Sequence, residues 1–197
     1  MSLARLLRIL AAVIQMFACA RSATADGPVP AHDSSSHFPG PRIPADNPMN
    51  PAKVQLGRYL FYDKRMSING TTSCSTCHRQ ELAFTDGRPQ SVGATGQVHP
   101  RNAISLANVA WEAALNWSDA RTHSLEEQAL KPMFSEAPLE MGLGAIRGEF
   151  LRLTETDSVY RPLFRRAFPG VAEVYSISNI AKALAAFERT IISSDSP

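Results

Sequence analysis

Residues 73–78 have the sequence Ser-Cys-Ser-Thr-Cys-His, which contains the C-x-x-C-H pattern that attaches a c-type haem. In this chemistry the thiols of Cys74 and Cys77 add to the haem vinyl groups, and the imidazole of His78 binds the iron. The two intervening residues match about one helical turn, so both sulfurs can meet one edge of the porphyrin. The motif therefore predicts one covalently bound haem c, with His78 as an axial ligand of its iron.

Two other uses of a C-x-x-C pair fit this sequence less well. A zinc site would need two further Cys or His ligands, and the remaining histidines do not pair at ligand spacing: His32, His37, His99 and His123. A thiol–disulfide oxidoreductase usually places its C-x-x-C between a strand and a helix, and no strand is predicted before Cys74. Haem attachment is the favoured interpretation.

The N-terminal residues predict export from the cytoplasm. Arginines at positions 5 and 8 precede an apolar run from Ile9 to Ala18 that ends in small residues, the order of a signal peptide. We therefore expect residues 1–25 to be a signal peptide and the protein to be periplasmic. Residues 26–49 are rich in Pro, Ser, Gly and Asp and predict an irregular leader, and we expect the folded domain at residues 50–197.

Hydrophobic periodicity predicts helices and no strands in the folded part. The Asn50-Pro51 pair suggests an N-cap followed by proline at the first helical position, and a capping-box pattern starts at Ser124. Helices are expected at residues 50–62, 105–115, 124–134, 145–154, 159–168 and 178–192. The expected fold is an all-α c-type cytochrome domain with long loops around one covalently bound haem, and the loop at residues 93–100 is expected to line its site.

Charge and cysteine content exclude several classes of protein. The 197 residues contain 20 Lys plus Arg and 18 Asp plus Glu, without a long run of like charge, so neither nucleic acid nor an anionic membrane surface is predicted as a partner. Of the three cysteines, Cys19 falls within the predicted signal peptide. The two that remain belong to the haem motif, which excludes a disulfide scaffold.

The sixth coordination position of the iron decides what the haem does. A strong second ligand favours electron transfer, whereas an open position permits chemistry with peroxide or oxygen. From residue type alone, the sixth position either has no protein ligand or is occupied by one of four side chains, which are Met66, Met133, Met141 and His99. Each of these also has an ordinary explanation as a core or loop residue.

Five segments together resemble the bacterial dihaem cytochrome c peroxidase and MauG family. Their order and spacing are those of the family's N-terminal, peroxidatic haem domain, and the resemblance extends over about residues 47–197. The segments are 56–67 (LGRYLFYDKRMS), 73–78 (SCSTCH), 100–102 (PRN), 116–121 (NWSDAR) and 139–141 (LEM).

The resemblance implies a role for each matching residue. His78 corresponds to the proximal iron ligand, Glu140 to the distal acid–base residue and Gln128 to a distal glutamine. Trp117 corresponds to the aromatic residue between two haems, and Asn102 to a calcium ligand. The implied activity is reduction of hydrogen peroxide through a high-valent iron–oxo state, with electrons from a small redox protein or a protein substrate.

The sequence departs from the family in two ways. Ala94 stands where typical peroxidases of the family have a histidine that binds the peroxidatic iron, so an open iron is expected, as in the MauG-like branch. Family members also carry a second C-x-x-C-H motif in a C-terminal domain, and this sequence has none. We therefore expect that domain to be missing, together with its electron-transfer haem and further calcium ligands. A homodimer is expected only of the full-length protein.

Two other functions remain open. The chain could be a monohaem electron-transfer cytochrome in which Met133 or Met141 is the second axial ligand. It could also be a non-catalytic remnant that binds haem covalently and turns over no substrate.

Overall fold

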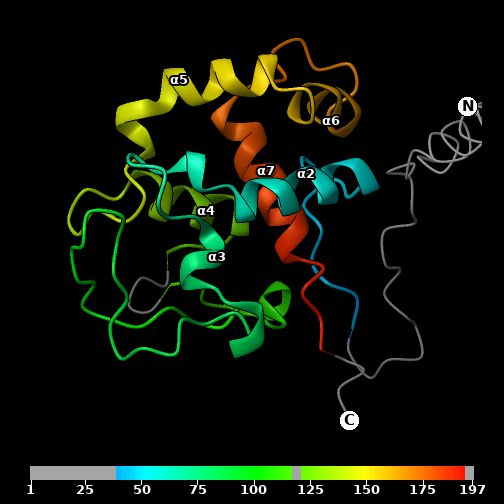
Figure 1. Ribbon diagram of the computed structural model, residues 1–197. Helices are drawn as coiled ribbons and strands as arrows, with labels where there is room; N and C mark the ends of the chain where they lie inside the picture. The colour runs from blue at the N-terminus through cyan, green and yellow to red at the C-terminus, as the bar shows by residue number, and fades with distance from the viewer. Residues whose placement is uncertain (1–38, 117–120, 194–197) are drawn as a thin grey trace, which may run out of the picture.

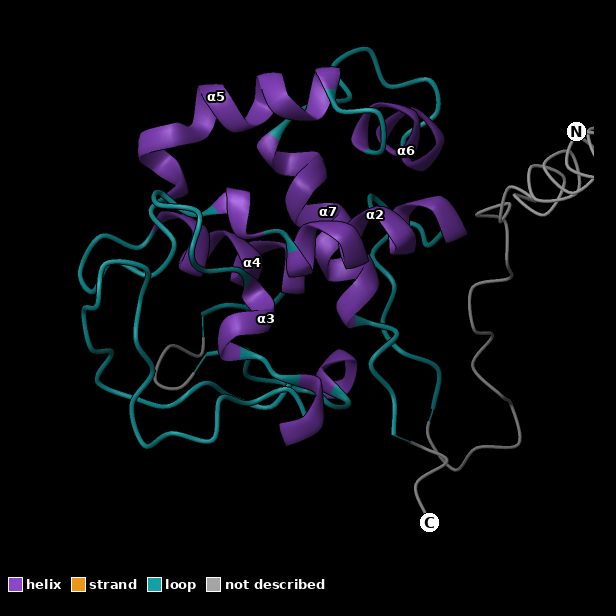
Figure 2. Cartoon of the chain, viewed as in Figure 1, coloured by secondary structure: helices purple, strands orange, loops and turns teal. Residues whose placement is uncertain are grey.

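A computed structural model describes residues 39–116 and 121–193, and it is built from helices joined by long loops (Figure 1, Figure 2). Over these two stretches, strand-like pairing is limited to isolated bridges, such as that between Val92 and Val98. The predicted all-α class is confirmed. No helix in these two stretches has the length and apolar character needed to span a membrane. The predicted signal peptide lies outside the described residues.

The helices follow the sequence in a simple order. They are α2 (Pro51–Tyr62), η1 (Lys64–Met66), α3 (Cys74–Cys77), η2 (Gln80–Leu82), η3 (Val109–Trp111), α4 (Leu125–Phe134), α5 (Leu143–Thr156), α6 (Tyr160–Ala167) and α7 (Ile177–Glu188). In Figure 1, α7 passes through the middle of the molecule beside α2, and α5 runs along one side. Helix α2 packs on α7 and α6, and α4 packs on α7.

The boundary signals account for most of these helices. The Asn50 side chain accepts a hydrogen bond from the Lys53 backbone at 2.7 Å, and proline follows at the first helical position. Ser124 caps α4 in the same way through the Glu127 backbone N–H at 3.1 Å. Helix α4 contains Pro132 and ends two residues later, so this proline stands in the last turn.

The predicted helix at residues 105–115 is wrong. Only the short 3-10 helix η3 forms there, because Asn108 adopts a left-handed backbone with a φ of 61°. The Asn108 backbone N–H donates to the Ile191 carbonyl at 2.8 Å, and its side chain pairs with Ser193. These contacts replace the helical bonds, while Leu106, Val109 and Leu115 still point into the core.

The core lies where α2 crosses α7. Gly57 meets the backbone of α7 at this crossing, where an added Cβ would lie 1.9 Å from the Ala183 carbonyl oxygen. The apolar side chains around the crossing are fully buried, including Leu56, Leu60, Phe61, Ile180 and Leu184. Glycine is therefore required because the two backbones approach so closely.

The irregular segment before α2 is attached to the bundle by Asn47. Its side chain is fully buried and donates to the Lys182 carbonyl at 3.0 Å, while the Lys53 ammonium donates to its amide oxygen at 2.9 Å. Asn47 also donates to Glu126, which accepts a bidentate pair of hydrogen bonds from Arg189. Asn47, within the leader expected at residues 26–49, thus joins this leader to α4 and α7.

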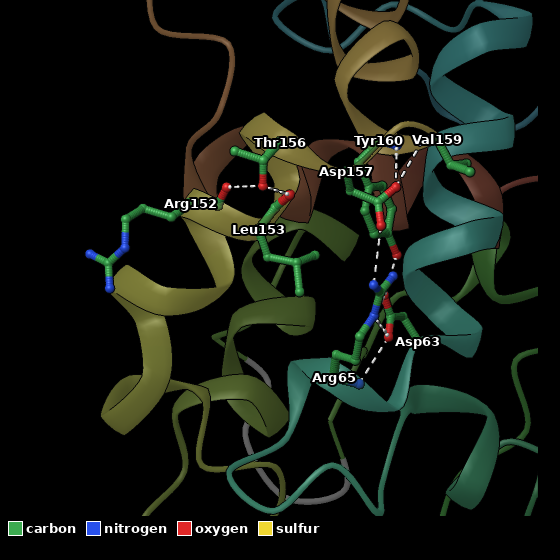
Figure 3. A network of polar contacts seen from close by, with 8 residues as sticks. All are labelled: Asp63, Arg65, Arg152, Leu153, Thr156, Asp157, Val159 and Tyr160. Atoms are coloured by element: carbon green, nitrogen blue, oxygen red, sulfur yellow. Dashed lines mark hydrogen bonds and ion pairs between the residues drawn. The ribbon is translucent and has the colours of Figure 1, made fainter.

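A polar network fastens η1 to the start of α6 (Figure 3). The Tyr160 hydroxyl donates to Asp63 at 2.6 Å, and the Arg65 guanidinium bridges Asp63 and Asp157. Burial opposes ionisation of Asp63, but hydrogen bonds from Arg65 and Tyr160 outweigh it and hold the pKa of this carboxyl below its usual value. The Asp157 side chain in turn accepts from the Val159 and Tyr160 backbones, which sets the turn between α5 and α6.

Replacing Gly57 by alanine is expected to destabilise the protein by at least about 2 kcal/mol, because the new methyl group collides with the backbone of α7. Helix propensity alone would give the opposite sign, a gain of about 1 kcal/mol. Gly148→Ala in α5 is the matched control, since an added Cβ there meets only the flexible Arg152 side chain at 3.6 Å. Urea unfolding of both variants measures the difference, and equal effects would refute the close-contact explanation.

Tyr160→Phe is expected to lower the free energy of unfolding by about 1.5–3 kcal/mol, since it removes a buried hydrogen bond to a charged carboxylate. Tyr59→Phe, on an exposed face of α2, should change it by less than about 0.5 kcal/mol. Chemical denaturation at neutral pH tests both. A Tyr160→Phe variant as stable as the control would show that Arg65 alone sustains the network.

Candidate functional site

The C-x-x-C-H motif forms the short helix α3. The Thr76 hydroxyl accepts a hydrogen bond from the Ser73 backbone at 3.0 Å, and the His78 backbone N–H donates to the Cys74 carbonyl at 2.9 Å. This single turn places both cysteine side chains and the histidine beside one cavity, as the spacing of the motif predicts. Both thiols are free, so the pair forms no disulfide.

The ring of His78 is oriented by a backbone carbonyl. Its Nδ1 lies 2.9 Å from the Phe84 carbonyl oxygen, so Nδ1 carries the proton and Nε2 is available to a metal. Ala83 and Phe84 both have positive φ angles, 52° and 59°, a strained pair that turns the carbonyl toward the ring. Burial lowers the pKa of His78, which favours the neutral imidazole that binds iron.

The cavity beside α3 has mostly apolar walls. Apolar side chains come from the loop after η2, from α4, from the loop between α4 and α5, and from α7, and they include Leu106, Ala129, Pro132, Leu139, Met141 and Leu184. Cys74, Cys77 and His78 line the same cavity. An apolar space with two thiols and one oriented imidazole fits a covalently attached haem.

The protonation of the thiols argues against thiol–disulfide exchange at this motif. Burial raises the pKa of Cys77 to about 11 and raises that of Cys74 further. A redox-active C-x-x-C pair needs a thiol with a lowered pKa, so this environment does not suit thiol–disulfide exchange. Over residues 39–116 and 121–193, no cluster of three or more Cys, His, Asp or Glu side chains that could hold a metal ion is found.

Glu140 and Gln128, predicted on the distal side, both line the cavity. Gln128 projects from α4, and Glu140 lies on the loop between α4 and α5. Burial raises the pKa of Glu140, and the nearby His99 partly opposes this shift. The structure thus brings an acid and an amide to the cavity that holds the attachment motif, while their catalytic roles stay predictions.

Glu188 is a cavity residue that the sequence analysis did not identify. It stands one turn after Leu184 on α7, is only 6% exposed, and has no hydrogen bond or ion pair within the described part of the chain. Burial raises its pKa from the ordinary 4.5 to about 8. The i, i+4 spacing from Leu184 on the apolar stripe of α7 was the only signal that could have revealed it.

The candidates for the sixth iron position separate into two groups. Met66 and Met133 are fully buried core residues that do not line the cavity, whereas Met141 and His99 do. Ala94, at the position of the family's histidine, contributes its backbone N–H to the Glu140 carbonyl at 2.7 Å. Among the described residues, Met141 and His99 therefore remain as candidate ligands.

Two predicted site residues are not placed at the cavity. Trp117 lies outside the described residues. Asn102 is partly buried on the loop before η3 and does not line the cavity, and its side chain donates to the Ala103 carbonyl at 3.3 Å. A calcium site at Asn102 stays a prediction.

Comparison with known proteins matches this architecture to one family. The family described as di-haem cytochrome c peroxidase matches residues 51–197. The methylamine utilization protein MauG of Methylorubrum extorquens is 37% identical over 154 residues, covering 78% of this chain and 42% of that protein. The cytochrome c551 peroxidase of Pseudomonas aeruginosa is 33% identical over 150 residues, covering 76% of this chain and 42% of that protein.

A solved structure shows the same similarity. A MauG-like protein associated with microbial copper homeostasis aligns with a TM-score of 0.79 and 47% sequence identity, covering 82% of this chain and 47% of that one. The chain thus spans less than half the length of these relatives.

Glu188→Gln is expected to stabilise the haem-loaded protein increasingly as the pH rises. The pKa of Glu188 is raised on folding, so its favourable contribution is complete below about pH 4.5 and is lost as the pH rises through about 8. Glutamine does not titrate, so its relative gain between these limits reaches a few kcal/mol, with an upper bound of about 5 kcal/mol. Urea unfolding at both pH limits tests this.

Glu155→Gln, at an exposed position on α5, is the control and should show no such trend. A difference between Glu188→Gln and wild type that is the same at both pH limits would contradict the assigned protonation state.

Proposed function

This chain belongs to the di-haem cytochrome c peroxidase family, a family of haem oxidoreductases, and we propose on that premise that its helical domain is a peroxidatic haem domain. The observation that carries the proposal is the shared cavity. Cys74, Cys77 and His78 line it together with Glu140 and Gln128, so the groups that would hold haem and those that would handle protons face one space.

Haem would be held by thioether bonds to Cys74 and Cys77 and by the Nε2 atom of His78. When bound, the haem iron would bind hydrogen peroxide and pass to it the electrons that cleave its O–O bond. The proposed reaction consumes one peroxide, two electrons and two protons and yields two water molecules. The electrons come from a small redox protein or an oxidisable protein substrate, with Trp117 as the proposed relay.

The protein's own residues manage the protons and the solvent. Glu140 accepts a proton from one peroxide oxygen and returns it to the other, which leaves as water. Gln128 offers an amide that can hydrogen bond the peroxide. The apolar walls from α4 and α7 exclude bulk water, which strengthens each polar contact inside the cavity.

The remaining parts of the proposal concern the full protein. We propose an exported, periplasmic protein with a signal peptide at residues 1–25, a leader at 26–49 and the haem domain at 50–197. The second haem belongs to a further domain of the kind found in the longer relatives, and calcium binds near Asn102 at the interface with that domain.

Glu140→Gln is expected to lower the second-order rate constant for the reaction of the haem-loaded chain with hydrogen peroxide by about 10²–10⁴, because the acid–base group is lost. Stopped-flow absorption spectroscopy measures this rate. Glu136→Gln is the matched control, an exposed glutamate in the same loop, and should react like wild type.

One observation favours an electron-transfer cytochrome as the second candidate, namely that Met141 also lines the cavity. Under that function the ferric haem is six-coordinate with a methionine–iron charge-transfer band, which Met141→Leu abolishes, and peroxide leaves the spectrum unchanged. That combination of results would refute the peroxidase proposal.

A further inference from the structure

The loop at residues 91–101 folds back on itself and carries His99 to the cavity. The His99 backbone N–H donates to the Ser91 carbonyl at 2.8 Å, and the Ser91 N–H donates to the Arg101 carbonyl at 3.0 Å. Further along, the Gly93 N–H donates to the Gln97 carbonyl at 2.9 Å. These paired bonds give a two-stranded loop whose register sets the position of His99.

This loop is joined directly to the segment that carries Glu140. The Ala94 N–H donates to the Glu140 carbonyl at 2.7 Å, and the Leu139 N–H donates to the Gln97 side-chain oxygen at 2.8 Å. At Gly93 an added Cβ would lie 1.9 Å from the Leu139 carbonyl oxygen, so the two backbones touch. The positions of His99 and Glu140 are therefore fixed relative to each other by main-chain contacts.

The ring of His99 is oriented toward the carboxylate. Its Nδ1 accepts a hydrogen bond from the Arg101 backbone N–H at 3.3 Å, so in the neutral ring the proton resides on Nε2. That Nε2 lies 3.6 Å from the Glu140 Oε1 atom, within ion-pair distance. The side chains are 27% and 34% exposed, so the pair stands at the rim, between the cavity and solvent.

We propose that His99 is a positioning residue for Glu140, which directs its Nε2–H at the carboxylate, and that it is not an iron ligand. The proposal rests on the peroxidatic function proposed above. Glu140 can take a proton from an incoming ligand only in its carboxylate form, and its burial works against that form. His99 partly offsets this penalty, and its 27% exposed side chain stands at the rim of the cavity.

The other titratable groups of the cavity do not position the Glu140 carboxylate. Cys74 and Cys77 cease to titrate once they become thioethers, and the Nδ1 atom of His78 is engaged by a backbone carbonyl. Glu188 also lines the cavity, but it lies on α7 and has neither a hydrogen bond nor an ion pair within the described residues. Among these groups, only His99 lies within ion-pair distance of Glu140, with its Nε2 atom 3.6 Å from Oε1.

Cyanide binding to the ferric haem-loaded full chain tests the proposal without requiring turnover. Hydrogen cyanide must lose its proton to bind iron as an anion, so its association rate reports on the base in the cavity. In His99→Gln the acid limb of the rate profile is expected to move up by about one pH unit, which slows association about tenfold below that limb and little above it. The absorption spectrum should keep the wild-type spin state.

Two further variants sharpen the test. His123→Gln, an exposed histidine away from the cavity, should leave the profile unchanged. In a Glu140→Gln background the His99→Gln substitution should have no further effect, because the pair acts as one unit. An unshifted acid limb in His99→Gln, or a change from low to high spin that marks a lost iron ligand, would overturn the proposal.

These outcomes also separate the two proposals. If the wild-type protein fails to react with peroxide but the cyanide profile shifts in His99→Gln, the peroxidatic function fails and the pairing of His99 with Glu140 stands. If peroxide reacts and the profile does not shift, the function stands and the pairing fails.

Discussion

The hydrogen bond between the His78 ring and the Phe84 carbonyl supports the whole site. It sets which ring nitrogen is free and in which direction it points, and it exists only because Ala83 and Phe84 adopt left-handed backbones. The cost of that strained turn is met by packing, since the Phe84 ring contacts Phe61 of α2, which in turn contacts Phe187 of α7. Helix α3 is a single turn and is too short to be stable alone, so its geometry derives from the α2–α7 crossing behind it.

The two glutamates that line the cavity differ in their surroundings, and this difference suits them to different roles. Glu140 stands at the rim beside a histidine, whereas Glu188 is enclosed by α7 and its neighbours without a polar partner in the described part of the chain. Both have raised pKa values because burial disfavours the charged form, and each has a cationic neighbour that partly opposes the shift, His99 for Glu140 and Arg189 for Glu188. The rim acid is therefore suited to exchange protons, and the enclosed acid is suited to remain neutral.

Sequence patterns predicted the features that depend on residues close together in the chain, such as helix caps and apolar helix faces. The C-x-x-C-H spacing, the Asn50 and Ser124 caps and the apolar stripe of α7 each describe one turn or one face of a helix, and the structure confirms them. The features that the sequence did not predict depend on contacts with residues far away in the chain. The helix expected at residues 105–115 is replaced by bonds from Asn108 to the chain after α7, and Glu188 becomes a cavity residue only through the packing of α7 on α4. The pairing of His99 with Glu140 likewise joins two loops that no periodic pattern connects.

The 91–101 loop and the segment around Leu139 and Glu140 are joined by main-chain hydrogen bonds, and this support is separate from that of the haem-attachment motif. The residues that attach haem depend on α2, α3 and α7, whereas the residues facing them depend on main-chain bonds between two loops. Substitutions at positions such as Gln97 or His99 can alter reactivity without disturbing cofactor attachment. The fold thereby holds the cofactor-attaching residues on the helices and the residues that face them on two joined loops, so that the two groups are supported by different parts of the chain.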